Sequence, residues 1–170
     1  MPKPSDLIVL ATVAAGAGTG AAIDMWTRRV PNPLTALLAA SGVLLAAYGV
    51  SGISVGSSFA GLLVGFSLML PGYLIGGTGA GDVKLFAALG TLLGPAPIAL
   101  AFLYTLLAGG ALALLVAVRR RRLRRTLDGT ARLVASGPAA AAAIESPLEN
   151  NRFAYAPAIA VGTMLAALGL

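Results

Sequence analysis

Residues 98–118 of the chain read IALAFLYTLLAGGALALLVAV, an apolar run of 21 residues without a charged side chain. A helix needs about 20 mostly apolar residues to cross the roughly 30 Å hydrocarbon core of a bilayer. Helix is the expected structure because backbone groups in lipid must be paired within the spanning structure itself. This stretch therefore predicts a membrane-spanning helix, and the other apolar blocks of the chain can be compared with it.

Five further apolar blocks predict additional spans of the same kind. The fourth block is short, because its apolar core, Leu85–Leu93, would extend only about 14 Å as a helix. The first block follows a single basic residue, Lys3, and is followed by Asp24, which argues against a signal peptide. We expect an all-α polytopic membrane protein with one domain, residues 1–170, and a basic loop at 119–153. Its six transmembrane helices are expected at 7–23, 33–50, 58–75, 83–94, 98–118 and 154–170.

The composition of the chain restricts its chemistry. Apolar residues make up 58% of the chain and charged residues 11%, against about 45–50% and 25% in soluble domains. The chain contains no Cys and no His, which excludes disulfides, thiol nucleophiles, Cys-ligated metals and Ser-His-Asp catalysis. We expect no metal, no cofactor and no nucleic-acid partner. Any catalysis must use the six carboxylates, the hydroxyls, or Lys and Arg.

The basic residues predict the orientation in the membrane. Lys and Arg in short loops mark the cytoplasmic side. If all six blocks cross, every basic residue except Lys3 lies on one side, including Arg28, Arg29 and the cluster Arg119–Arg125. If the fourth block did not cross, that cluster would lie on the other side of the membrane from Arg28. The charges therefore favour six crossings, with both chain ends outside the cytoplasm.

Two of the six carboxylates stand at the ends of predicted spans. Asp24 directly follows the first block, and Asp82 immediately precedes the fourth. Ionisable residues at membrane depth are costly and usually functional. Two carboxylates brought close together do not both ionise readily, which suits a protease that pairs one carboxylate with one carboxylic acid. The structural alternative is that both residues cap helices or pair with Arg28, Arg29 or Lys84.

The sequences around the two aspartates are distinctive when taken together. Residues 24–35 read DMWTRRVPNPLT, and residues 79–85 read GAGDVKL. The chain resembles the type 4 prepilin peptidase family of GxGD-type intramembrane aspartic proteases. That family has an Asp, a basic stretch and Ile/Val-Pro-Asn-x-Leu-Thr, followed later by Gly-x-Gly-Asp-x-Lys-Leu. The last block, with YAPAIAVG at 155–162, is similar more weakly, because Ala154 stands where the family often has Pro.

The resemblance implies an aspartic endopeptidase that removes the short basic leader from prepilins or related precursors at the cytoplasmic face of a bacterial membrane. Asp24 and Asp82 would be its catalytic pair, without a metal. The short, Cys-free connection after the first block implies a minimal member, like those of tight-adherence (Flp) pilus systems, without methyltransferase activity. The oligomeric state is left open. Supporting motif residues would be Pro31, Asn32, Gly79, Gly81 and Lys84.

Three features of the sequence each fit more than one interpretation. Lys84 either acts on a neighbouring acidic group or is an interfacial anchor whose amine reaches the headgroups. The cluster Arg119–Arg125 fits anionic lipid better than a substrate whose leader is itself basic. A small ion- or proton-coupled transporter would use Asp24 and Asp82 as carriers, and a non-catalytic scaffold of a pilus or secretion assembly would not need the two motifs.

Overall fold

The computed structural model describes residues 4–119 and 155–169. These residues form α-helices and no strand, which confirms the expected all-α class. The loop expected at 119–153 and the lipid contact expected at Arg119–Arg125 lie outside the described residues, apart from the backbone of Arg119. The six helices are α1 (Pro4–Thr27), α2 (Asn32–Ala47), α3 (Val55–Leu74), α4 (Ala80–Leu93), α5 (Pro95–Arg119) and α8 (Ala156–Ala167).

Three of these helices, α1, α3 and α5, are long and apolar enough to cross a membrane. Helices α2 and α8 are apolar but shorter. Large apolar side chains point outward, such as Leu63 of α3 (62% exposed) and Leu107 of α5 (71% exposed). A helix that is apolar on its outer as well as its inner side is typical of a membrane span. The bundle therefore has the exterior expected of a membrane protein.

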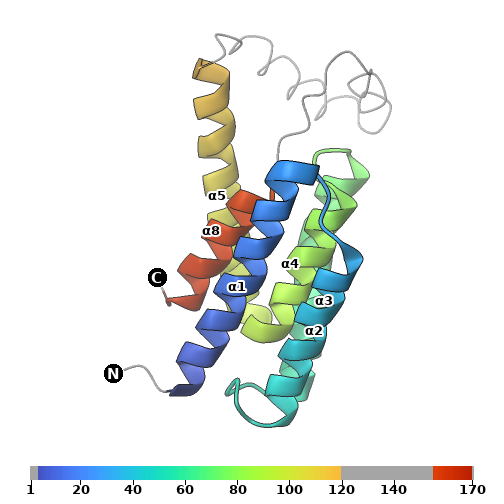
Figure 1. The fold of residues 1–170 in the computed structure, drawn as a ribbon, viewed down its shortest axis with the longest axis vertical. Helices are drawn as coiled ribbons and strands as arrows, with labels where there is room; N and C mark the ends of the chain where they lie inside the picture. The colour runs from blue at the N-terminus through green and yellow to red at the C-terminus, as the bar shows by residue number, and fades with distance from the viewer. Residues whose placement is uncertain (1–3, 120–154, 170) are drawn as a thin grey trace.

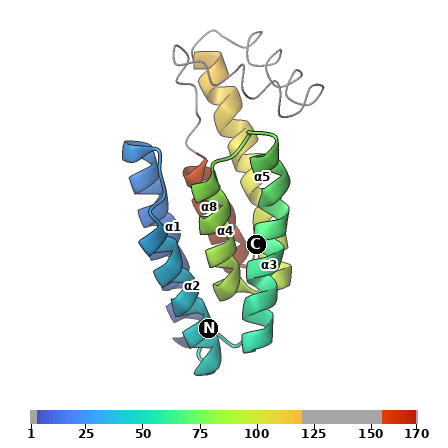
Figure 2. The ribbon, with the colours of Figure 1, turned by 90° about the vertical axis from the view of Figure 1, so that its right-hand side faces the viewer.

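The chain reverses direction at each connection of the bundle. Figures 1 and 2 show that α1, α3 and α5 end, and α2, α4 and α8 begin, at the same end of the molecule. We call this the motif end, because it holds residues 24–35 and 79–85. The arrangement agrees with the expected alternation, including a fourth helix that runs opposite to α3 and α5.

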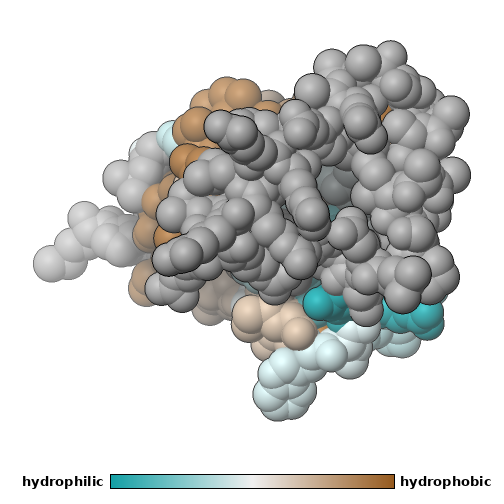
Figure 3. All heavy atoms as spheres, turned by 90° about the horizontal axis from the view of Figure 1, so that it is seen from above, coloured by the Kyte–Doolittle hydropathy of each residue, from teal (hydrophilic) through white to brown (hydrophobic). Residues whose placement is uncertain are grey.

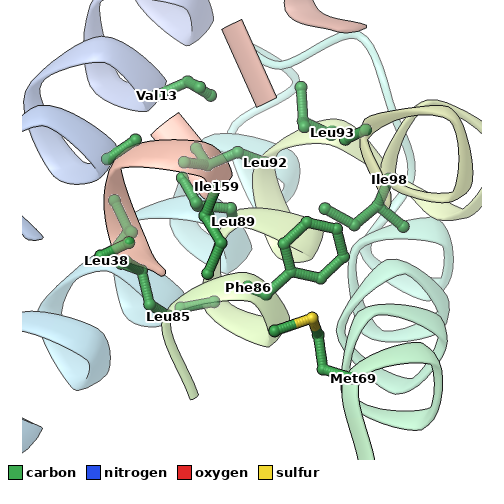
Figure 4. Packing of buried hydrophobic residues seen from close by; sticks show 14 of the residues in the cluster. Val13, Leu38, Met69, Leu85, Phe86, Leu89, Leu92, Leu93, Ile98 and Ile159 are labelled. Atoms are coloured by element: carbon green, nitrogen blue, oxygen red, sulfur yellow. The ribbon is translucent and has the colours of Figure 1, made fainter. Parts of the chain in front are cut away.

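The short helix α4 occupies the centre of the bundle. Figure 2 shows it between α2 and α3, with α8 behind it. All of its residues from Leu85 to Leu93 are buried. In Figure 4, the ring of Phe86 of α4 lies beside Ile98 of α5, and Met69 of α3 is close by. Protein surrounds α4, so its 14 residues, about 21 Å at 1.5 Å each, do not have to match the thickness of a lipid layer.

Close helix packing around α4 depends on small residues. Gly61 of α3 and Gly90 of α4 face each other so closely that a methyl group on either would overlap the carbonyl oxygen of the other. Small residues let helix backbones approach in this way, which is a major source of association energy between helices in lipid. The glycines at this crossing thus let α4 pack backbone to backbone against α3.

Candidate active site

Asp24 lies in the last turn of α1, which continues past the apolar block through Thr27. The helix ends at Arg28, which adopts a left-handed conformation with φ of 52°. The backbone N–H of Arg28 donates to the Asp24 carbonyl oxygen at 2.8 Å and completes the final turn. The Asp24 side chain is only 7% exposed. It points into the bundle, where the backbone N–H of Ala156, at the start of α8, acts as its hydrogen-bond donor.

Asp82 lies in the first turn of α4. Its Oδ2 accepts a hydrogen bond from the backbone N–H of Gly79 at 3.1 Å, and its own N–H donates to the Gly79 carbonyl oxygen. This is the return half of a capping box, in which a side chain pairs an N–H group that the helix itself leaves unpaired. The side chain of Asp82 is also 7% exposed. The carboxyl group is therefore buried and held in one orientation at the start of the helix.

The packing of α1 against α4 brings the two carboxyl groups together. A methyl group at Gly20 would approach Leu85 Cδ2 to 2.8 Å, so these two residues mark the contact between the helices. Asp24 lies one turn beyond Gly20, and Asp82 lies one turn before Leu85. Because the helices are antiparallel, both steps lead toward the motif end. The two carboxyl groups interact electrostatically there.

Each carboxyl group keeps one oxygen without a hydrogen-bond partner. Within the described part of the chain, Asp24 Oδ2 and Asp82 Oδ1 are buried side-chain oxygens that no donor reaches. Buried polar groups are usually paired, and a catalytic role is one explanation for an exception. Two such oxygens from different helices at one end of the bundle can act together on a water molecule and a substrate carbonyl.

The model of the type IV leader peptidase family matches residues 9–114, which is more than half of the chain. The chain belongs to the type IV leader peptidase family. The match includes both Asp24 and Asp82, and it confirms the resemblance inferred from their motifs. No curated protein and no solved structure matches the chain.

The membership makes the chain a peptidase of a membrane-embedded family, and the residues flanking the aspartates lie together as its motifs predict. Val30 is buried against Gly81, where an added methyl group would come within 3.1 Å of the Val30 backbone nitrogen. Pro31 precedes α2 as its N-cap residue. The loop before α2 and the glycine-rich turn before α4 therefore pack directly on each other.

Lys84 has a partner that the sequence motifs did not suggest. Its Nζ donates to Oδ1 of Asn32, the first residue of α2, at 3.1 Å. The two residues are exposed at the motif end. Figure 3 views the bundle from this end and shows strongly hydrophilic residues at one edge, while apolar residues extend along the flank. The sequence also allowed Asp24 to pair with a basic residue such as Arg28. This alternative holds in part, because Arg28 interacts electrostatically with the Asp24 carboxyl group.

The contribution of α8 to the site was missed from the sequence. Tyr155 precedes α8, packs its ring against Gly109 of α5 and lies near Asp82. Pro157 is the signal that predicts this position, because Pro favours the first turn of a helix and so places residues 155 and 156 at a helix start. Among the described residues, no group of three or more Asp, Glu, His or Cys could hold a metal ion.

Proposed function

We propose that the chain is an aspartic endopeptidase that removes the short basic leader from type IV prepilins or related precursors, with Asp24 and Asp82 as the catalytic pair. One observation carries the proposal: two buried carboxyl groups, from α1 and α4, lie at one end of the bundle, each with an unpaired oxygen. The peptidase family supplies the reaction class.

The mechanism follows from the proximity of the carboxyl groups. Two adjacent carboxyls do not both ionise readily, so one stays protonated. The ionised carboxylate takes a proton from a water molecule as its oxygen attacks the scissile carbonyl carbon, while the protonated carboxyl donates a hydrogen bond to the carbonyl oxygen. As the tetrahedral intermediate breaks down, the C–N bond breaks and the amine nitrogen takes the proton that the first carboxylate removed from water, which restores that carboxylate. Such a pair titrates jointly rather than as two separate groups.

The position of the pair supports a substrate with a polar leader followed by an apolar segment. The carboxyl groups lie at the ends of apolar helices, at the same end of the bundle as the exposed Arg28, Arg29 and Lys84. In a precursor whose apolar segment lies in the membrane, the peptide bond between the leader and that segment would lie at the depth of the two carboxyl groups. By the positive-inside rule the motif end faces the cytoplasm, and both chain ends lie on the opposite side of a bacterial cytoplasmic membrane.

The connection between α1 and α2 supports a minimal enzyme. It consists of residues 28–31, and its ends are fixed by the left-handed Arg28 and the N-cap Pro31. Larger relatives, as the family resemblance implies, carry an insertion here that is associated with methylation of the new N-terminus. We therefore propose leader cleavage without methyl transfer, as in tight-adherence pilus systems.

Co-expression with a candidate prepilin tests the proposal, with leader removal followed by a mobility shift and by mass spectrometry. Asp24→Asn and Asp82→Asn should each lower the cleavage rate by at least about a hundredfold, because each removes one general acid–base group. Asp6→Asn is the matched control, since Asp6 is exposed in the first turn of α1, at the opposite end of the bundle. Membrane levels are measured for all three variants.

One result would contradict the catalytic pair, and one would show that the assay is unsuitable. Efficient cleavage by either active-site variant would show that the dyad is wrong. Equal loss in Asp6→Asn would show that the assay reports general damage rather than catalysis. Mass spectrometry of the mature pilin also tests the minimal-enzyme proposal, because a methylated N-terminus that depends on this chain would refute it.

A further inference from the structure

A hydrogen bond at the motif end joins the two sequence motifs. Lys84 Nζ donates to Asn32 Oδ1 at 3.1 Å, and the two residues are 52 positions apart. Asn32 opens α2, directly after the short connection from α1, and Lys84 lies two residues after Asp82. The bond therefore links the segment that follows Asp24 to the helix turn that carries Asp82.

Lys84 does not lie beside Asp82 on the surface of α4. Residues two positions apart on a helix point about 200° apart, so their side chains do not face each other. Asp82 faces the α1 side of α4, as does Leu85 one turn later, whereas Lys84 reaches α2. The amine thus contacts the segment after Asp24 rather than the carboxyl group of Asp82.

A displacement of Asn32 can reach Asp24 through the short segment that connects them. The Thr27 hydroxyl lies 2.9 Å from the Ile23 carbonyl oxygen and 3.0 Å from that of Arg29, and so ties the end of α1 to the connection. Arg28 reverses the chain with its left-handed backbone. Val30 is then buried against Gly81, the residue before Asp82. The connection is therefore held by the hydrogen bonds of the Thr27 hydroxyl and by the direct contact of Val30 with the turn that carries Asp82.

We infer that Asn32 and Lys84 form a clamp that sets the separation between the Asp24 and Asp82 carboxyl groups. The Gly20–Leu85 contact holds α1 against α4 on the membrane side of the carboxyl groups, and the clamp holds the connection against α4 at the motif end. Asn32 and Lys84 are positioning residues in this arrangement, acting through the backbone segments beside them. The catalytic consequence rests on the proposed function, whereas the effect on helix separation does not.

Near-isosteric variants separate the hydrogen bond from the shape of the residues. Asn32→Leu keeps a similar size and removes the acceptor, and Lys84→Met keeps a similar length and removes the donor. Asn32→Asp is the matched control, because it keeps an acceptor for the amine and adds an opposite charge. Both positions are exposed, so these changes should leave the fold intact. Membrane levels of each variant check this.

Kinetics of leader cleavage give the first readout. Asn32→Leu and Lys84→Met should each lower kcat about ten- to a hundredfold, with a smaller change in KM, because misplacing a catalytic group by about 1 Å has effects of that order. The kcat of the double variant should be no lower than that of the less active single variant, because both substitutions remove the same hydrogen bond. The pH profile should change in both, because joint titration depends on carboxyl separation. Asn32→Asp should stay within about twofold of the wild type, since its bond remains.

A second readout works without substrate. The chain has no Cys, so cysteines placed at Trp26 and Ala80, which are exposed beside the two aspartates, give a unique pair of spin-label sites. Pulsed dipolar spectroscopy should show a broader or longer distance distribution when Asn32→Leu is added, and an unchanged distribution when Asn32→Asp is added. This measurement tests the clamp even if no cleavage is observed.

The outcomes are distinguishable. Wild-type kinetics and unchanged distances in Asn32→Leu and Lys84→Met overturn the clamp and leave Lys84 as an interfacial anchor. Reduced cleavage with unchanged distances and an unchanged pH profile, and no rescue in Asn32→Asp, also overturns it and indicates contact with the substrate. Broadened distances in a protein that cleaves no prepilin support the clamp and refute the proposed function.

Discussion

Helices α4 and α5 are neighbours in the sequence and both are rich in apolar residues, but they occupy different environments. Helix α4 has 14 residues and is buried from Leu85 to Leu93, whereas α5 has 25 residues and exposes Leu103, Leu107 and Leu114. An apolar residue is stable both against lipid and against other helices. Hydropathy alone therefore does not distinguish a helix that faces the membrane from one that other helices surround.

The strongest test of this comparison substitutes one glycine in each helix. Gly90→Leu should destabilise the bundle by about 3 kcal/mol, because the side chain enters the crossing with Gly61 and overpacks it. Gly110→Leu is the matched control, since nothing lies within 4 Å of a methyl group at that position of α5. Its effect should stay within about 0.5 kcal/mol, as for surface substitutions in general. The free energy of unfolding is measured by titrating mixed micelles with a denaturing detergent. Equal effects would show that α4 is not more tightly enclosed than α5.

Truncating one large side chain in each helix should give a smaller difference. Phe86 is fully buried and meets the ring of Phe102 edge to face, with centroids 6.1 Å apart. Phe86→Ala should cost about 2 kcal/mol, less than the 3–5 kcal/mol typical of soluble cores, because the lost contacts are not accompanied by transfer from water. Leu107→Ala should cost less than about 0.5 kcal/mol, since lipid replaces its outward contacts. The same detergent titration measures both, and a large loss for Leu107→Ala would place that residue in a helix interface.

Part of the fold and of the candidate site could be predicted from the sequence. Apolar blocks and the positions of the basic residues predict the helices and their direction, and the motifs at Asp24 and Asp82 predict that these residues meet. The end of α1 was harder to predict, because Met25–Thr27 continue the helix beyond the apolar block. An apolar block indicates which residues contact lipid or protein. The helix itself ends where its backbone hydrogen bonding ends, which here is at Arg28.

Contacts between distant segments could not be predicted in the same way. The bond between Asn32 and Lys84 depends on the rotation of α2 and α4 about their axes, and no local pattern encodes that rotation. The approach of Ala156 to Asp24 depends on how α8 packs against α1. The central place of α4 depends on glycine contacts whose spacing also fits general helix packing. These features require the tertiary structure.

The smallest expected effect concerns a single hydrogen bond that holds α4 in its place. The Ser58 hydroxyl of α3 donates to the Thr91 carbonyl oxygen of α4 at 2.8 Å, and Ser58 is fully buried. Ser58→Ala should cost about 0.6 kcal/mol, the average for hydrogen bonds between membrane helices. Ser41→Ala is the control, because the Ser41 hydroxyl donates to Leu37 within its own helix and joins nothing to α4. If the two substitutions have the same effect in the detergent titration, backbone packing rather than side-chain hydrogen bonding keeps α4 between its neighbours.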